Sequence, residues 1–411
     1  MTGPDPAPAE AAAAASAAAV AWDGFAARHW AREPVVLPAP GGTDAVDPRL
    51  AYAVMVEAAW PFRTGTRFRA LPDVRFLVDG GRIRAPGDLL PGPGDTTAAR
   101  YAHRLDTRME GRGRLLAVEQ PLVLDHRLWA GVRELVAPLW ERIGHPVLPV
   151  VSELALGDGA VDGDGLTREP VHSTLVWVLR GTLTAVPHGP AGGPALTAGA
   201  GDLLHWPAGR PYALRYGART LALRLLVPGD PRLLTEAVKD VVAGILHERR
   251  GDDRVPYLPP PPATGDGPAP DVPHLADAGR ALREVTGADR LDRALGVLWA
   301  RRASAAALEP VPDPRPPVRL SPDDRVRPGS PVVRMPLEDG RSWVWAVDGH
   351  AFSLRGALGE RVLERLRRDG APTVRELCAL AGPGREEGVV ALLEKLYALR
   401  GVDVAGREAP K

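Results

Sequence analysis

The sequence predicts an α+β protein whose main part is a small antiparallel β-barrel, followed by a helical region and a terminal module of strands and helices. The barrel is indicated by residues 169–226, where short runs rich in β-branched and aromatic residues alternate with turns, as in consecutive hairpins. Apolar residues at helical spacing after residue 230 indicate the helical region. Strand-like runs followed by helical runs after residue 331 indicate the terminal module.

The composition restricts the classes to which the protein can belong. Its 411 residues, 45% of them hydrophobic, suffice for more than one domain with a sizeable core. With 51 Lys and Arg against 51 Asp and Glu, the formal net charge is zero, which gives no general attraction to nucleic acid or to an anionic membrane. No apolar run reaches the roughly 20 residues that a membrane-spanning helix needs. Cys378 is the only cysteine, which excludes an intrachain disulfide and favours a cytoplasmic protein.

Residues 1–20 are rich in Ala and Pro and predict a disordered tail, and residues 21–229 are expected to form the barrel domain. Within the hairpins, an apolar strand leads into Gly181, and a second strand begins after Gly201 and stops at Pro207. The segments before the hairpins predict helices at 22–30, 47–59 and 126–143, and strands at 35–37, 74–78, 115–124 and 146–156.

The second half of the chain predicts a helical region at 230–309 that contains a Pro-rich linker, and a winged-helix-like domain at 318–411. In that domain we expect strands at 332–335 and 342–347 and helices at 357–368, 373–380 and 386–399. The last helix carries Glu386, Glu387 and Glu394 against Arg385 and Lys395. Nucleic-acid phosphates would be repelled as much as attracted, so contact with protein is the preferred interpretation.

One motif in the second hairpin is specific. Gly201 is followed by five residues, then by Pro207, Ala208 and Gly209, and two residues later by Tyr212. This spacing resembles the cupin pattern G-x5-P-x-G-x2-H, in which a metal-binding histidine occupies the last position.

Nearly the whole chain resembles the JmjC-type oxygenases of the ribosomal-oxygenase (cupin-4) group, with matching segments in the same order. WDGFAARHWAREPVVL resembles the opening helix and strand of that group, and RSWVWAVDGHAFSL resembles its terminal module. The resemblance implies a double-stranded β-helix (cupin/jelly-roll) barrel, a helical dimerisation region and a C-terminal winged helix. It also implies iron(II)- and 2-oxoglutarate-dependent protein hydroxylation and a homodimer.

The ligand residues of the family do not carry over to this sequence. At the family's spacing, Arg168 and Pro170 stand where the His-x-Asp pair belongs. Leu183 stands where a basic residue would hold the co-substrate, and Tyr212 replaces the second histidine. We therefore expect no bound cofactor and a non-catalytic or altered protein that binds a protein or peptide. Tyr212 is expected to fill the space of the lost ligand and to hydrogen-bond across the barrel mouth.

Two alternatives remain open. An active hydroxylase with a rearranged iron(II) and 2-oxoglutarate site would use His172 with Glu169 or His205. A metal-free cupin enzyme would use Tyr212 and His205 as acid and base, which requires both side chains to face one cavity. The simpler interpretation places His172 at a strand edge and packs His205 into the core. Arg168, if it points inward, would pair with Glu169 or Glu153.

Overall fold

The computed structural model describes residues 22–41, 46–66, 72–109, 111–162, 171–188, 193–229, 290–337, 342–382 and 384–406, with a few positions between 235 and 283. The predicted tail, the Pro-rich linker and most of the helical region at 230–289 lie outside the described residues. The chain divides into two compact units. Unit one comprises residues 1–231 and 305–315, and unit two comprises residues 232–304 and 316–411.

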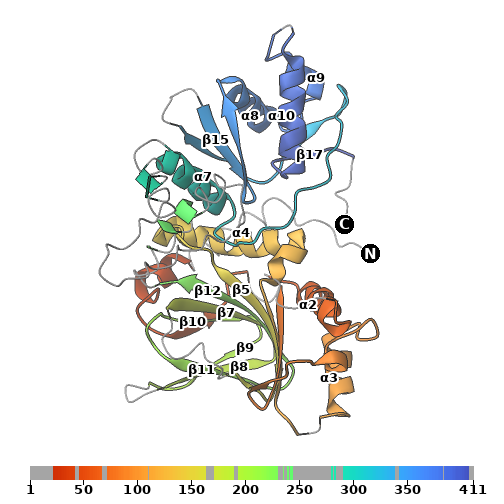
Figure 1. The fold of residues 1–411 in the computed structure, drawn as a ribbon, viewed down its shortest axis with the longest axis vertical. Helices are drawn as coiled ribbons and strands as arrows, with labels where there is room; N and C mark the ends of the chain where they lie inside the picture. The colour runs from red at the N-terminus through yellow and green to blue at the C-terminus, as the bar shows by residue number, and fades with distance from the viewer. Residues whose placement is uncertain are drawn as a thin grey trace, which may run out of the picture. The chain divides into compact units, whose positions relative to one another are not determined.

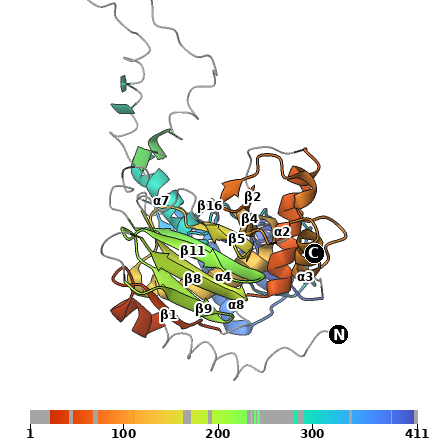
Figure 2. The same cartoon turned by 90° about the horizontal axis from the view of Figure 1, so that it is seen from below.

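Unit one is built on two antiparallel sheets that face each other (Figure 1). The eight-stranded sheet has the order β1 (Val35–Pro38), β10 (Asp202–Trp206), β7 (His172–Arg180), β12 (Thr220–Pro228), β5 (Val151–Asp158), β4 (Arg114–Glu119), β2 (Asp73–Val78) and β3 (Gly81–Arg82). The four-stranded sheet has the order β6 (Val161–Asp162), β11 (Tyr212–Tyr216), β8 (Thr182–Pro187) and β9 (Leu196–Gly199). Figure 2 shows β11, β8 and β9 side by side. The arrangement agrees with the predicted barrel.

The predicted hairpin turn at Gly181 joins β7 to β8. Gly181 has φ of 78°, in the left-handed region that favours glycine. A Cβ atom at this position would lie 2.7 Å from the Oγ1 atom of Thr220 and would collide with it. Thr220 in turn donates a hydrogen bond to the carbonyl oxygen of Thr182 at 2.7 Å. The turn residue and the neighbouring strand therefore fix the register of the hairpin together.

The space between the two sheets is filled by one apolar group, here called the inner cluster. Alternate residues of the strands point into it because successive side chains of a strand face opposite sides. Its members are Leu77, Leu115, Ala155, Ala160, Val176, Val178, Leu183, Ala185, Ala198, Leu204, Trp206, Tyr212, Leu214, Tyr216 and Ala222. The other face of the large sheet packs against helices, so the large sheet is covered on both sides.

The helices of unit one are α2 (Pro48–Arg63), α3 (Ala98–Asp106) and α4 (His126–Ile143), with a helical segment at 22–28. Helix α4 confirms the helix predicted at 126–143, and its apolar residues Leu128, Val132 and Leu139 are buried. The helix begins after Asp125, whose side chain accepts a hydrogen bond from the backbone N–H of Leu128 at 2.8 Å. Two short 3-10 turns, Gly87–Leu89 and Pro121–Leu124, complete the covering layer.

The strand predicted at 115–124 is shorter than expected. It ends at Glu119, and Gln120 then adopts φ of 56°, which turns the chain into the 3-10 turn that begins at Pro121. Proline has no backbone N–H to donate to a neighbouring strand, so the sheet cannot continue through Pro121. Strand β6 was not among the predicted strands.

Residues 305–315 return to unit one after the helical region. The indole N–H of Trp129 donates to the carbonyl oxygen of Leu308 at 3.0 Å. The indole N–H of Trp140 donates to the carbonyl oxygen of Ala306 at 2.9 Å. Accordingly, α7 (Arg290–Ser304), which lies in the predicted helical region, ends before this segment, and Ala306 and Ala307 have positive φ.

Unit two contains a three-stranded antiparallel sheet of β14 (Val333–Pro336), β15 (Ser342–Val347) and β16 (His350–Arg355). Helices α8 (Leu358–Asp369), α9 (Val374–Cys378) and α10 (Glu386–Ala398) follow, and β13 (Val326–Pro328) pairs with β17 (Val402–Val404). The two predicted strands and three predicted helices are present, whereas β13, β16 and β17 were not predicted. The winged-helix assignment stays a prediction. In the described part of the chain, no helix is long and apolar enough to cross a membrane.

Candidate functional site in the barrel

Tyr212 and Leu183 lie on neighbouring strands of the small sheet and both face the inner cluster. Tyr212 is the first residue of β11 and pairs with Pro187, while Leu183 pairs with Tyr216 further along the same two strands. Leu183 is fully buried among apolar side chains. The family resemblance places a basic residue that binds the co-substrate at this position. Leu183 instead contributes an uncharged side chain to the core.

Tyr212 connects the two sheets. Its hydroxyl donates a hydrogen bond to the Oγ1 atom of Thr174 on β7, with 2.7 Å between the oxygens. Its ring packs against the indole of Trp206, with 4.8 Å between ring centroids. Only 6% of Tyr212 and 1% of Thr174 are exposed, so this hydrogen bond is sealed from solvent. The expectation that Tyr212 bonds across the barrel is met in this geometry.

His172 lies near the same end of the barrel, but the described residues do not supply the further ligands that a metal site would need. It is the first residue of β7, two residues before Thr174, and therefore shares the inward register of Thr174. Burial lowers the pKa of its imidazole. Within the described ranges, no group of three or more His, Cys, Asp or Glu side chains could hold a metal ion. Arg168, Glu169 and Pro170 lie outside the described residues.

His205 faces the opposite side of the large sheet from Tyr212. Its neighbours Leu204 and Trp206 belong to the inner cluster, so His205 points away from the barrel interior. The imidazole stacks on Trp30 at 5.2 Å and meets Phe25 edge-on at 5.1 Å between ring centroids. It is a packed histidine, and it does not share with Tyr212 the single cavity that an acid–base pair requires.

The surroundings of His205 fix its protonation. Nδ1 lies 3.1 Å from the backbone carbonyl oxygen of Thr174, which can only accept, so Nδ1 carries the proton. Nε2 is buried and has no hydrogen-bond partner among the described residues. Burial lowers the pKa of His205 to about 4, because a second proton would place a charge between the rings of Phe25 and Trp30.

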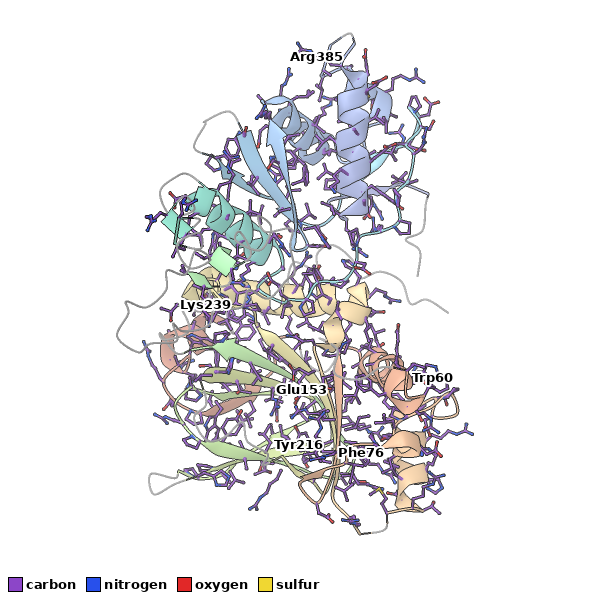
Figure 3. The ribbon with its side chains drawn as sticks, viewed as in Figure 1. Trp60, Phe76, Glu153, Tyr216, Lys239 and Arg385 are labelled. Atoms are coloured by element: carbon purple, nitrogen blue, oxygen red, sulfur yellow. The ribbon has the colours of Figure 1, made fainter. Side chains whose placement is uncertain are left out.

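A buried group of three charged side chains was not predicted, and we call it the inner ion cluster. Glu153 on β5 forms ion pairs with Arg224 on β12, at 2.7 Å, and with Arg75 on β2. Side-chain exposure is 3% for Glu153, 5% for Arg224 and 15% for Arg75. Figure 3 shows Glu153 and Tyr216 on strands of the barrel, between the two sheets.

The strand register explains why these charges point inward. Arg75 lies two residues before Leu77, Glu153 two residues before Ala155, and Arg224 two residues after Ala222, and those three apolar residues belong to the inner cluster. Glu153 was expected only as a possible partner of Arg168. A charged residue between apolar neighbours, as in LALRLLV around Arg224, was the signal that could have identified the cluster.

An open pocket of about 550 Å³ lies at the end of the barrel where β11 begins. Its wall includes Trp206, Leu196 and four prolines, namely Pro34, Pro187, Pro194 and Pro211. Glu33, His188 and Arg210 also line it. The wall is held by the backbone hydrogen bond from His188 N–H to the Pro211 carbonyl oxygen and by the bond from the Trp206 indole to the Arg210 carbonyl oxygen, both 2.9 Å long.

Comparison with solved structures identifies the fold of the chain. The structure is similar to that of the ribosomal oxygenase YcfD from Escherichia coli in complex with cobalt and succinic acid, with 17% sequence identity and a TM-score of 0.51. That match covers 94% of this chain and 98% of the YcfD chain. Another crystal structure of YcfD gives 17% identity, a TM-score of 0.51 and coverage of 93% and 98%. No protein-family model and no curated protein sequence matches. The resemblance to the ribosomal oxygenases is thus confirmed at the level of the fold.

Proposed function

We propose that this chain is a JmjC-like protein in which the barrel no longer holds iron and 2-oxoglutarate, and that it binds a protein or peptide instead. The observation that carries the proposal is the sealed hydrogen bond from Tyr212 to Thr174 at the position of the family's second metal-binding histidine. The YcfD structure with cobalt and succinic acid indicates that the fold can take a metal and a small carboxylate. The residues of this chain do not fit that use.

The residue types at the ligand positions support this. Leu183 has no donor or acceptor for a carboxylate, and Arg168 and Pro170 have no atoms suited to iron. The phenol of Tyr212 is committed to Thr174. A metal ion would have to displace the hydroxyl from a buried hydrogen bond and leave the Thr174 oxygen without its donor.

The electrostatics of the interior support it as well. In the inner ion cluster, two guanidinium groups surround one carboxylate. Charges interact more strongly in a buried setting than in water. The carboxylate of Glu153 is engaged by both Arg75 and Arg224, so a divalent cation would have to break these ion pairs to use it as a ligand.

The binding role rests on the pocket at the barrel end and on the charge pattern of α10. Pockets of about 300–1,000 Å³ are typical of ligand sites, and the volume of about 550 Å³ is within that range. Helix α10 carries both signs of charge on its surface, which favours a protein partner over nucleic acid. A homodimer and a cytoplasmic setting belong to the proposal.

Anaerobic reconstitution with iron(II), followed by measurement of metal content and of 2-oxoglutarate turnover, tests the loss of the cofactors. The expected result is no stoichiometric iron and no turnover above that of protein-free controls. Stoichiometric iron together with turnover would overturn the proposal.

The competing candidate is a rearranged site around His172, which its inward register favours. The variant His172→Ala distinguishes the two. If the wild-type protein binds iron and the variant does not, the rearranged site is correct. The matched variant His188→Ala removes an exposed histidine outside the barrel interior and controls for adventitious binding.

A further inference from the structure

Two charged side chains, Glu33 and Arg210, line the pocket at the barrel end. Glu33 contributes the one carboxylate among the lining residues, and it is engaged by the Nδ1 atom of His29 at 2.9 Å. Arg210 is exposed, and no carboxylate among the described residues pairs with its guanidinium. The Glu33 carboxylate keeps its charge but is hydrogen-bonded to His29 and not paired with Arg210, so the pocket presents a guanidinium that has no ion pair among the described residues beside an apolar wall.

The wall itself is largely apolar and offers few hydrogen-bond donors to a ligand. Four of its residues are prolines, which have no backbone N–H to donate. The indole N–H of Trp206 is already used by the carbonyl oxygen of Arg210. Donors for a ligand acceptor thus come mainly from the Arg210 guanidinium and from the exposed imidazole of His188. A guanidinium recognises a carboxylate with two parallel hydrogen bonds, which makes a carboxylate the matching group.

From this complementarity we propose that the pocket binds a short apolar peptide segment that carries an acidic side chain, with the carboxylate on Arg210 and the apolar residues against the proline wall. The inference rests on the proposed function and specifies the chemical class of the partner. A free anion would not use this pocket fully. A lone carboxylate would leave the apolar wall uncovered and would fill only a small part of the volume of about 550 Å³.

Three fluorescein-labelled, N-acetylated heptapeptide pools test the inference by fluorescence anisotropy with the full chain. Each pool is randomised among Leu, Val, Phe and Pro at the outer positions, and the central residue is fixed as Glu, Gln or Lys. The Glu pool is expected to bind about tenfold or more tightly than the Gln pool, as for the loss of one charged hydrogen-bond pair. The Lys pool is expected to bind more weakly than the Gln pool.

Three variants test whether this preference arises at the pocket. Arg210→Glu should lower the affinity for the Glu pool about tenfold or more. It removes no ion pair among the described residues, and the Arg210 carbonyl oxygen still receives the Trp206 indole N–H, so folding should be kept. The matched variant Arg215→Glu changes an exposed arginine on β11 that does not line the pocket, and it should bind the Glu pool like the wild type. Pro194→Trp, at an exposed position of the wall, should obstruct all pools.

The outcomes separate the two levels of the proposal. If peptides bind but the central residue and Arg210→Glu make no difference, the acidic preference is refuted while peptide binding stands. If N-acetylglutamate competes as well as unlabelled Glu pool, the ligand is a free carboxylate and the peptide inference fails. If no pool binds, the inference fails, and the loss of iron and 2-oxoglutarate is judged separately by metal content and turnover.

Discussion

Replacing His205 by Asn should make the stability of unit one less sensitive to acid. The folded-state pKa of His205 is about 4, below the ordinary value of 6.5, so the unfolded chain binds more protons between these two values. Protonation therefore favours the unfolded state as the pH falls below about 6.5, at about 1.4 kcal/mol per pH unit, until the folded histidine itself titrates. Between pH 7 and pH 5 the wild-type protein should lose about 2 kcal/mol through this residue alone.

The variant keeps the polar contact and removes the titration. The amide N–H of Asn can replace Nδ1–H as donor to the Thr174 carbonyl oxygen, and an amide does not titrate in this range. The absolute stability will fall because the stacking on Trp30 is lost, so the informative quantity is the change between the two pH values.

Urea unfolding at pH 7 and pH 5, followed by tryptophan fluorescence, measures this change. Hydrogen exchange of amides in β7 and β10 restricts the measurement to unit one. His188→Asn controls for the removal of an exposed imidazole. An equal loss of stability in the wild-type protein and in His205→Asn would refute the reasoning.

Three further substitutions test the interior of unit one by their free energies of unfolding. Glu153→Gln removes the one carboxylate of the inner ion cluster and leaves two buried guanidinium groups facing each other, so the free energy of unfolding should fall by about 3–5 kcal/mol. The exposed Glu134→Gln should change it little. Equal effects of the two substitutions would contradict the role of the cluster. Tyr212→Phe removes the hydroxyl and should cost about 1 kcal/mol, unless the bond to Thr174 contributes nothing. Gly181→Ala introduces a Cβ at positive φ against Thr220 and should lower the free energy of unfolding by about 1–3 kcal/mol. An unchanged urea midpoint of unfolding would show that the turn can relax.

The parts of the fold that depend on local sequence could be predicted. Gly181 ends β7 where expected because only a residue tolerant of positive φ can make that turn beside Thr220. The apolar face of α4 follows from helical spacing alone. The same holds for β15, whose alternating Trp and Val residues were interpreted as a strand.

The parts that depend on distant contacts could not be predicted. Glu153 and Arg224 lie far apart in the sequence, and their pairing requires the register of β5 against β12. On its other side β12 pairs with β7, and that pairing shifts register between Leu221 and Ala222, opposite Arg180 and Val178, which no local pattern indicates. His205 was a candidate ligand and proved to be packed because Phe25 and Trp30 come from the opposite end of the domain sequence.

The return of residues 305–315 to unit one makes that unit discontinuous in sequence. The carbonyl oxygens of Ala306 and Leu308 are the acceptors for the indoles of Trp140 and Trp129, both of which are fully buried. A chain cut after Pro231 would keep every strand of the barrel and still leave two buried N–H donors without acceptors, at about 1–3 kcal/mol each. A stable barrel expressed by itself therefore requires residues 305–315. They can be connected either by the natural intervening chain or by a short loop that replaces residues 232–304.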